Sequence, residues 1–459
     1  MKSIPGPKTP AIVQQMQWTL DPVQTMETCA QKYGDIFMLQ AGLSNSATVY
    51  VSSPEAQKEV LTKKNQYEAP SNMILKSLLG EKSMIVLEGD RHRQERKLLM
   101  PPFHGDRMRN YGELMRNITK EAASNLTEGK TFIARQLMQE ITMQVIIQAV
   151  FGLQDSPRLS QIRSSLGDFV QMIASPVRAS LLFFPWLQKD LGPWSPWGKY
   201  QLQQQKLNEL LYTEIATRRS QLDPDRNDIF TLMLLARDEE GQGMTDQEIR
   251  DELMTMLFAG YETSATTLAW AVYWIYKQPE VYQKLMQELE TLEIDTADPM
   301  TIFHLPYLTA VCQETLRLYP AGMFTFPRRT KQPVELQGYH LEAGTMIQGS
   351  IHLTHQREDL YPEPKKFKPE RFLERQYSPY EYLPFGGGSR RCLGMALASF
   401  EMRVVLATLL SNFEMELAEN KPVKPKRRGL IVGPAGGVKM LMKGERKQVE
   451  KKSPSVAVV

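Results

Sequence analysis

The sequence predicts a mainly α-helical protein with small β-sheet regions. Between about residues 106 and 277, apolar residues recur at three- and four-residue spacing, with few helix breakers outside 175–198, as amphipathic helices require. Strand-like runs are confined to the stretches near 35–61 and 333–354, where Gly and Ser interrupt the apolar residues. Helices are therefore expected to form most of the structure.

The chain is expected to fold as one domain. Its 459 residues exceed the usual domain size of ~100–200 residues. However, 42% hydrophobic and 23% charged residues are typical of a globular chain, and no stretch in the middle resembles a linker. We expect residues 1–445 to form this domain and residues 446–459 to form a disordered tail.

Two elements can be placed in the first two thirds of the chain. The apolar runs of residues 35–61 predict a hairpin. The clearest helix begins at Thr245, because Thr-Asp-Gln-Glu forms a capping box with Glu248, and it continues without proline to Gln278. At ~1.5 Å per residue this helix would be ~45–50 Å long, so it should be a largely buried axis of the molecule.

The remaining third is more irregular. Pro306 predicts the start of a shorter helix that ends at Leu318, and residues 333–354 return to strand-like patterns. Residues 361–388, rich in Pro, Gly and charge, predict an ordered loop without regular structure, followed by a final helix over about 393–412.

Charge and hydropathy exclude several classes of protein. The 55 basic and 52 acidic residues give a net charge of +3, which provides no whole-molecule attraction for nucleic acid. A transmembrane helix needs ~20 apolar residues, and the most apolar stretch, residues 180–187, is shorter and contains Pro185. No transmembrane segment is predicted, although this patch leaves peripheral membrane contact open. The basic cluster of residues 424–428 fits a solvated surface better than a phosphate or lipid site.

The cysteines indicate a reducing compartment. Cys29, Cys312 and Cys392 are far apart and odd in number, which argues against a disulfide framework. The N-terminal residues MKSIPGPKTP lack the charged and apolar segments of a secretion signal. A cytoplasmic location is therefore expected.

The strongest motif is the run from Phe385 to Gly394, Phe-Gly-Gly-Gly-Ser-Arg-Arg-Cys-Leu-Gly. Its glycines allow the backbone to turn tightly and approach a flat ligand. Cys392 would offer a thiolate near the start of a helix, where backbone N–H groups stabilise negative charge. A lone cysteine after a glycine turn would be structural, but the complete run is far more specific.

A second motif, Ala259-Gly-Tyr-Glu-Thr263, lies in the middle of the long helix. Ala259 and Thr263 share one face, and small residues at 259 and 260 would leave room beside it. Glu262 and Thr263 combine an acid with an alcohol that can pass protons. Alone, this run would equally fit a packing glycine and a threonine that bonds back to its own helix.

A third motif, Glu314-Thr-Leu-Arg317, places two opposite charges on one face of the shorter helix. An isolated pair of this kind is usually surface decoration. Here Pro369-Glu-Arg-Phe372 follows and offers Arg371 as a third member of a buried cluster.

Together with Pro369-Glu-Arg-Phe372, these motifs resemble the signatures of the cytochrome P450 family and follow the family's order along the chain, and the resemblance covers about residues 4–443. It implies the cytochrome P450 fold, with haem b between the long central helix and the Cys-ligand loop. Cys392 would be the axial thiolate, which favours O–O cleavage. The resemblance also assigns proton transfer to Thr263 and Glu262, contact with the haem to Phe385, Ala259 and Gly260, and support of the loop to the Glu314, Arg317 and Arg371 cluster.

The resemblance further implies cations for the two haem propionates. The candidates are His92, Arg96, Arg328 and Arg390. The basic run 91–97 would otherwise be a solvated helix face. Arg329 competes with Arg328, which is favoured by its spacing from Gly338.

The implied activity is that of a monooxygenase, which inserts one oxygen atom of O2 into a C–H bond or double bond of a lipophilic substrate. No flavin, iron–sulfur or nicotinamide motif is present, so electrons originating from NAD(P)H would come through a separate ferredoxin or flavodoxin with its reductase. This partner would dock behind Cys392, near Arg391, Lys365 and Lys366. Similarity to soluble bacterial, particularly cyanobacterial, members that resemble fatty-acid hydroxylases favours a long-chain fatty acid, with a terpenoid or alkane next.

Alternatives remain open for the chemistry and the pocket. A peroxygenase or isomerase would keep the haem without external electrons, and a non-catalytic haem-binding or sensor protein would have no turnover. His352 and His355 are expected in an extended segment, on opposite faces, and not as a metal pair. The expected substrate-pocket residues, which would otherwise be core, are Phe169, Met172, Ile173, Leu257, Phe258, Ala321, Met323, Phe324 and Phe326.

Overall fold

The structure, a computed structural model, describes residues 3–41, 47–71, 73–101, 107–152, 157–174, 188–226 and 228–446. The apolar patch at 180–187 and residues 447–459 of the expected tail lie outside these ranges, as does the Ile173 side chain. Predictions that concern them are therefore not addressed by the described residues.

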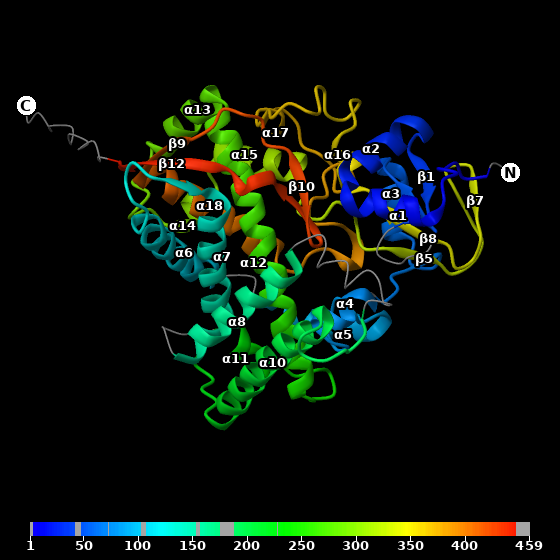
Figure 1. Ribbon diagram of the computed structural model, residues 1–459, viewed down its shortest axis with the longest axis horizontal. Helices are drawn as coiled ribbons and strands as arrows, with labels where there is room; N and C mark the ends of the chain where they lie inside the picture. The colour runs from blue at the N-terminus through cyan, green and yellow to red at the C-terminus, as the bar shows by residue number, and fades with distance from the viewer. Residues whose placement is uncertain are drawn as a thin grey trace, which may run out of the picture.

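The predicted mainly α-helical fold is confirmed, with helices on the left of Figure 1 and a smaller strand-rich region at the right. The helices are α1 Ala11–Leu20, α2 Pro22–Tyr33, α3 Pro54–Thr62, α4 Met73–Leu79, α5 Gly89–Leu99, α6 Arg107–Ser124, α7 Ala134–Phe151, α8 Pro157–Ala174, α10 Pro196–Ser220, α11 Ile229–Leu235, α12 Asp246–Lys277, α13 Pro279–Leu289, α14 Pro299–Phe303, α15 Pro306–Leu318, α16 Ile351–His355, α17 Arg371–Glu374 and α18 Met395–Asn412.

The strands form small sheets. They are β1 Ile36–Leu39, β2 Thr48–Val51, β3 Tyr67–Glu68, β4 Thr131–Ile133, β5 Arg328–Thr330, β6 Val334–Leu336, β7 Tyr339–Leu341, β8 Met346–Gly349, β9 Phe413–Leu417, β10 Pro425–Arg428, β11 Ile431–Pro434 and β12 Lys439–Glu445. The largest sheet has the order β1-β2-β8-β5-β3, in which β2 and β8 are parallel and the other pairs antiparallel. A second sheet has the order β4-β12-β9, and β6–β7 and β10–β11 are two-stranded.

Helix α12 is the long axis that the sequence predicted. Its capping box is present: Glu248 N donates to Thr245 Oγ1 over 3.3 Å, and Thr245 N donates to Glu248 Oε2 over 2.9 Å. The helix runs through the middle of the molecule and packs along α7 (Figure 1). Most residues of 248–257 and 264–273 are buried, whereas Tyr261 is the only buried residue of 258–263. The axis is therefore open on one side at its midpoint.

Two predicted strand regions contain helices instead. Residues 54–62 form α3 after the β1–β2 hairpin, and residues 351–355 form α16 after β8. A serine caps each helix: Ser53 Oγ accepts from Ala56 N, and Ser350 Oγ accepts from Leu353 N, both over 3.2 Å. These caps outweigh the local strand pattern. The expectation that residues 333–354 are extended throughout was therefore wrong at its end.

Helix α18 begins two residues later than predicted, because Gly394 is its N-cap and the preceding loop extends to that residue. It is long and apolar enough to span a membrane, but two thirds of it is buried inside the protein. This composition is that of a central core helix.

Candidate functional site

The loop before α18 holds Cys392 at the mouth of the helix. Gly386 and Gly388 have φ values of 68° and 65°, which favour glycine. A Cβ at Gly388 would also lie 2.7 Å from the Leu61 carbonyl oxygen. Cys392 N donates to Phe385 O over 2.9 Å, which closes the loop between the first residue of the motif and the cysteine. The glycines thus allow a tight turn that directs Cys392 inward.

The Cys392 side chain combines accessibility with surrounding protein. It is accessible to solvent, yet surrounding protein raises the pKa of its thiol by desolvation. A hydrogen bond from the Gly394 backbone and the positive charges of Arg96 and Arg391 act in the opposite direction. Accessibility together with desolvation is expected for a group that lines an internal cavity. A bound metal ion would displace the thiol proton.

Four cationic candidates converge on this loop. Arg96 of α5 donates to Arg391 O over 2.8 Å, and Arg390 donates to Met84 O over 2.9 Å and to Leu87 O. Arg328 of β5 lies close enough that its Nη2 would be 3.3 Å from a Cβ at Gly388. The structure therefore brings together three elements that are distant in sequence.

No ion pair balances the charges of this cluster within the described residues, and the Glu88 carboxylate attracts Arg390 only from beyond ion-pair distance. None of His92, Arg96, Arg328 and Arg390 forms an ion pair there. Burial and the neighbouring Arg390 lower the pKa of Arg328 to about 10. Burial and the positive charges of Arg390, Arg96 and Arg328 lower the pKa of His92 to about 4.

Two buried nitrogen atoms of the cluster, Arg328 Nη2 and Arg390 Nε, have no hydrogen-bond partner. Buried cations are costly unless an anion compensates them. These orphaned donors fit the carboxylates of haem propionates, and the accessible Cys392 fits its iron. The residues present are therefore suited to the cofactor that the sequence motifs imply.

On α12, the opening at the midpoint exposes Ala259 and half-buries Thr263. Thr263 Oγ1 donates to Ala259 O over 2.6 Å, the bond within one helix that the sequence left as an alternative. Its oxygen can still accept hydrogen bonds.

The two neighbours of this face have other partners. Glu262 accepts from Gln139 Nε2 over 2.6 Å and from Arg135 Nη1 over 3.3 Å, both on α7. A Cβ at Gly260 would lie 2.9 Å from Ile146 Cδ1, so α7 fills the space that this glycine leaves. Space was expected beside both small residues of α12. The structure leaves it at the exposed Ala259, whereas α7 approaches Gly260 closely.

The predicted Glu-Arg-Arg cluster is present and complete. Glu314 accepts from Arg317 Nε over 2.7 Å and from Arg371 Nε over 3.1 Å, and all three side chains are buried. Arg317 Nη1 donates to His355 O over 2.7 Å. A carboxylate and two guanidinium groups thus join α15 to the segments on both sides of it.

His355 was not assigned a role from the sequence. Its Nε2 accepts from Leu383 N over 3.1 Å, which requires Nδ1–H to donate to Arg317 O, also over 3.1 Å. Burial and Arg317 lower its pKa to about 3. Because Leu383 lies two residues before Phe385, the first residue of the loop motif, this neutral histidine connects the Glu-Arg-Arg cluster to the Cys392 loop. The signal available in the sequence was Ser350, which can cap a short helix that ends at His355.

The other expected residues have different surroundings. His352 pairs with Glu27 over 2.9 Å. Phe169, Leu257 and Met323 pack in hydrophobic core clusters, whereas Phe258, Ala321, Phe324 and Phe326 are partly accessible. Arg390 stacks over the Phe326 ring at 5.2 Å. Of the nine expected pocket residues, only the accessible ones are therefore suited to line a pocket.

Comparisons with known proteins agree with this geometry. The cytochrome P450 family model matches residues 4–442. Cytochrome P450 135B1 of Mycobacterium tuberculosis is 33% identical over 448 residues, which cover 96% of this chain and 92% of that protein. Cytochrome P450 138 of the same organism is 29% identical, with 96% of both chains covered.

A solved structure, cyanobacterial CYP120A1 with bound retinoic acid, superposes with a TM-score of 0.81 at 26% identity, covering 93% of this chain and 96% of that one. The match of the family model along almost the whole chain, the identity to relatives and the shared fold show that this protein is a member of the cytochrome P450 family, the haem-thiolate monooxygenases.

Proposed function

We propose that this protein hydroxylates or epoxidises a lipophilic substrate, with a lipophilic carboxylic acid, namely a long-chain fatty acid, as the first candidate and a terpenoid or alkane next. The family is one of monooxygenases. The main observation that supports the haem site is the buried cationic cluster, which has unpartnered donors and lies beside an accessible Cys392. The carboxylic acid is supported by the retinoic acid bound to CYP120A1, a lipophilic acid in a protein of the same fold.

Each residue has a proposed part in this reaction. Haem supplies activation of O2 when bound, and the thiolate of Cys392 favours O–O cleavage. His92, Arg96, Arg328 and Arg390 hold the propionates. Ala259 leaves room beside α12, and Phe385 closes the loop through its carbonyl group. Gly260 contributes by letting α7 approach.

Proton delivery is proposed for Thr263 and Glu262. Thr263 Oγ1 donates to Ala259 O, so its lone pairs are free to accept a proton donor on the accessible side of α12. Glu262 must exchange Gln139 or Arg135 for water to supply protons. This acid–alcohol pair supports a reductase-dependent monooxygenase over a peroxygenase, an isomerase or a sensor.

The cofactor assignment is tested by the spectrum of the reduced protein with carbon monoxide. The red-shifted band of thiolate ligation should appear in the wild type and in the Cys29→Ala control, and be absent in Cys392→Ala. Cys29 is a matched control because it is buried far from the motif, in the core formed with Trp18 and Phe37. A band that survives in Cys392→Ala would contradict the assignment.

Proton delivery is tested by the ratio of product formed to NAD(P)H consumed. Thr263→Ala should divert electrons to peroxide, while Thr263→Ser should restore coupling. Thr267→Ala is the matched control, because Thr267 donates to Thr263 O over 2.9 Å one turn later. Unchanged coupling in Thr263→Ala would remove this residue from the mechanism, and turnover with peroxide alone would favour the peroxygenase.

The substrate is tested by binding spectra with long-chain fatty acids, terpenoids and alkanes. A fatty acid should displace water from the iron and shift the spin state at lower concentration than an alkane of equal length. Tighter binding of the alkane would reject the carboxylic acid. A complete lack of turnover with any lipid and a competent reductase would favour the sensor.

Electrons are proposed to originate from NAD(P)H and to arrive through a ferredoxin or flavodoxin with its reductase. All three cations expected to meet this partner are exposed, but Lys365 pairs with Glu27 and Lys366 with Glu363, whereas Arg391 forms no ion pair among the described residues. Arg391→Glu should therefore weaken reduction more than Lys365→Glu does, in a manner that decreases with salt. Equal effects would reject Arg391 as a docking residue.

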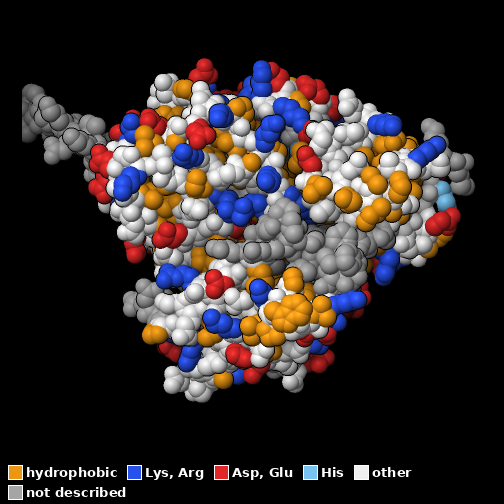
Figure 2. Space-filling model, in the orientation of Figure 1, with side chains coloured by type: hydrophobic (Ala, Val, Ile, Leu, Met, Phe, Trp, Pro, Cys, Tyr) orange, Lys and Arg blue, Asp and Glu red, His pale blue; other side chains and the backbone are white. Residues whose placement is uncertain are grey.

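We propose a cytoplasmic location with peripheral membrane contact. Hydrophobic side chains gather over α1 on the face shown in Figure 2, where Ile12, Met16 and Leu20 are 59%, 54% and 68% exposed. Such a patch fits an interfacial contact. Ile12→Gln with Met16→Gln should reduce co-sedimentation with lipid vesicles, and unchanged co-sedimentation would reject this contact.

A further inference from the structure

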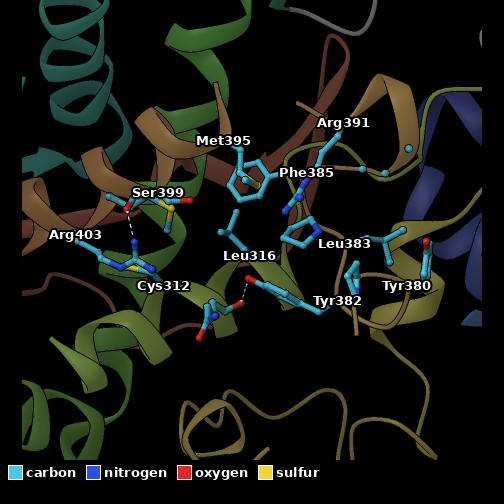
Figure 3. Close-up of a pocket in the computed structure, with 17 residues that line it drawn as sticks. Cys312, Leu316, Tyr380, Tyr382, Leu383, Phe385, Arg391, Met395, Ser399 and Arg403 are labelled. Atoms are coloured by element: carbon cyan, nitrogen blue, oxygen red, sulfur yellow. Dashed lines mark hydrogen bonds between the residues drawn. The ribbon is translucent and has the colours of Figure 1, made fainter. Parts of the chain in front are cut away.

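A separate pocket of about 400 Å³ lies on the other side of the Cys392 loop (Figure 3). The loop from Phe385 to Gly388 and residues of the preceding segment 379–384 form one wall, Leu316 of α15 lies on another, and Met395, Ser399 and Arg403 of α18 on a third. Cys392 and the four cations of the haem site do not line it. The pocket is therefore distinct from the haem site and shares only the loop with it.

The lining of this pocket has positive charge without negative charge. Arg391 stands at an exposed position and Arg403 at a buried one, 8% exposed, and no Asp or Glu is present in the lining. Among the described residues Arg403 forms no ion pair. Its Nη1 donates to Ser399 O over 3.2 Å, its guanidinium stacks on Phe303 at 4.2 Å, and its Nε has no hydrogen-bond partner.

The side chains nearest to Arg403 do not compensate its charge. Burial raises the pKa of the Cys312 thiol to about 12 and holds the pKa of Tyr382 well above its usual range, so both groups are neutral at physiological pH. Figure 3 shows Arg403 beside Cys312 and Ser399 at one end of the pocket. A buried guanidinium with an unused N–H donor is costly unless an anion from outside meets it.

We propose that this pocket is a binding site for a small organic carboxylate. The carboxylate would pair with Arg403, whose planar donors match it, and an apolar body would contact Leu316, Phe385 and Met395. These apolar walls favour an organic acid over inorganic phosphate. A volume of about 400 Å³ lies within the range of small-molecule sites, and the exposed Arg391 would attract an anion towards it.

The proposal is tested by calorimetric titration of the haem-loaded protein with benzoate, with the substrate site blocked by an azole that binds the iron. Benzoate should bind saturably, with a dissociation constant of about 1 mM or less, and benzamide and inorganic phosphate at least about tenfold more weakly. Arg403→Met should lose at least about tenfold in affinity for benzoate. Arg403→Lys should lose less, because it keeps the charge but not the fork.

Two further measurements keep the result independent of folding. Arg403→Met should retain the reduced carbon monoxide band and a thermal midpoint that is unchanged or raised, because it removes a buried uncompensated charge. Met395→Trp, which narrows the pocket without removing a charge, should also abolish benzoate binding. The proposal would be overturned if the wild type did not bind benzoate, or if Arg403→Met bound it equally well. It would also be overturned if benzoate bound no more strongly than benzamide or phosphate. Binding only of an acidic peptide would overturn it in favour of a protein contact.

Discussion

Two charged clusters flank the Cys392 loop. In the one that we call balanced, a buried carboxylate forms ion pairs with the cations, and in the one that we call unbalanced, no ion pair forms within the described residues. In the Glu314, Arg317 and Arg371 cluster, one carboxylate accepts from two guanidinium groups, and the remaining donors of Arg317 reach backbone carbonyls. Arg371 Nη1 donates to Pro362 O, whereas its Nη2 has no hydrogen-bond partner. In the cluster of His92, Arg96, Arg328 and Arg390, donors reach only backbone carbonyls, and two buried nitrogens have no partner.

This difference distinguishes a cluster that supports the fold from a cluster that binds a ligand. The balanced cluster has its counter-charge within the protein, and removing that counter-charge costs folding free energy. An unbalanced cluster is incomplete until an anion arrives, so its residues should matter little to the unliganded fold and strongly to the ligand. Arg403 belongs to the second kind, although it faces the opposite side of the loop.

The largest effect should come from breaking the balanced cluster. Glu314→Gln leaves the guanidinium groups of Arg317 and Arg371 buried without a counter-charge, and should lower the free energy of unfolding by about 3–5 kcal/mol. That is a large part of the about 5–15 kcal/mol of a typical domain. Urea unfolding measures it, with Glu363→Gln, an exposed carboxylate, as the control. A loss below about 1 kcal/mol would show that the cluster does not support the fold.

The next effect concerns the unbalanced cluster. Arg328→Met should leave the unfolding free energy of the haem-free protein unchanged or higher, because it removes a buried charge with an unused donor. It should weaken haem binding by about 1.5–3 kcal/mol, the value of a charge-assisted hydrogen bond, or roughly 10- to 150-fold. Urea unfolding of the haem-free protein measures the first quantity, and haem titration of the same protein measures the second. A large loss of stability without a loss of haem affinity would show that Arg328 supports the fold and does not bind haem.

His355, which contacts Arg317 of the balanced cluster, allows the contribution of this region to stability to be tested by changing the pH. Its pKa is about 3 in the folded protein, below the ordinary value of 6.5, so the unfolded chain takes up a proton first as the pH falls. The stability due to neutral His355 is present above pH 6.5 and is lost as the pH falls towards 3, with a slope of up to about 1.4 kcal/mol per pH unit. His355→Gln should remove this part of the slope between pH 6 and 4.5. The exposed His340→Gln should retain it, and equal slopes in wild type and His355→Gln would contradict the assignment.

Local signals in the sequence were sufficient for much of this molecule. The capping box fixed the start of α12 at Thr245, and Pro306 fixed the start of α15, because both ends depend on side chains within a few residues. The Cys392 loop, the Glu314 cluster and the four cations could be assigned by family motifs. The short helices α3 and α16 were missed because each depends on one serine cap in an otherwise strand-like run.

Other features depend on contacts that no local pattern contains. His355 gains its role from Leu383, 28 residues later, and Gly260 from Ile146 on α7. The sequence does not show that Arg403 has no nearby carboxylate in the pocket, because its neighbours in the sequence are those of an ordinary core helix. The pocket lining must be known first. The motifs therefore predict which residues meet, and the three-dimensional structure shows which charges remain unpaired.

The smallest effect separates Arg328 from its neighbour Arg329, the alternative that the sequence left open. Arg329 pairs with Glu68 over 2.7 Å on the exposed side of β5, whereas Arg328 is buried beside Arg390. Because exposed ion pairs contribute about 0–1 kcal/mol, Arg329→Met should change the free energy of unfolding by less than about 1 kcal/mol and leave haem affinity unaltered. Two methionine variants one residue apart then compare the two faces of one strand in the same urea and haem titrations. A loss of haem affinity in Arg329→Met equal to that in Arg328→Met would show that neither burial nor the orphaned donor of Arg328 determines propionate binding.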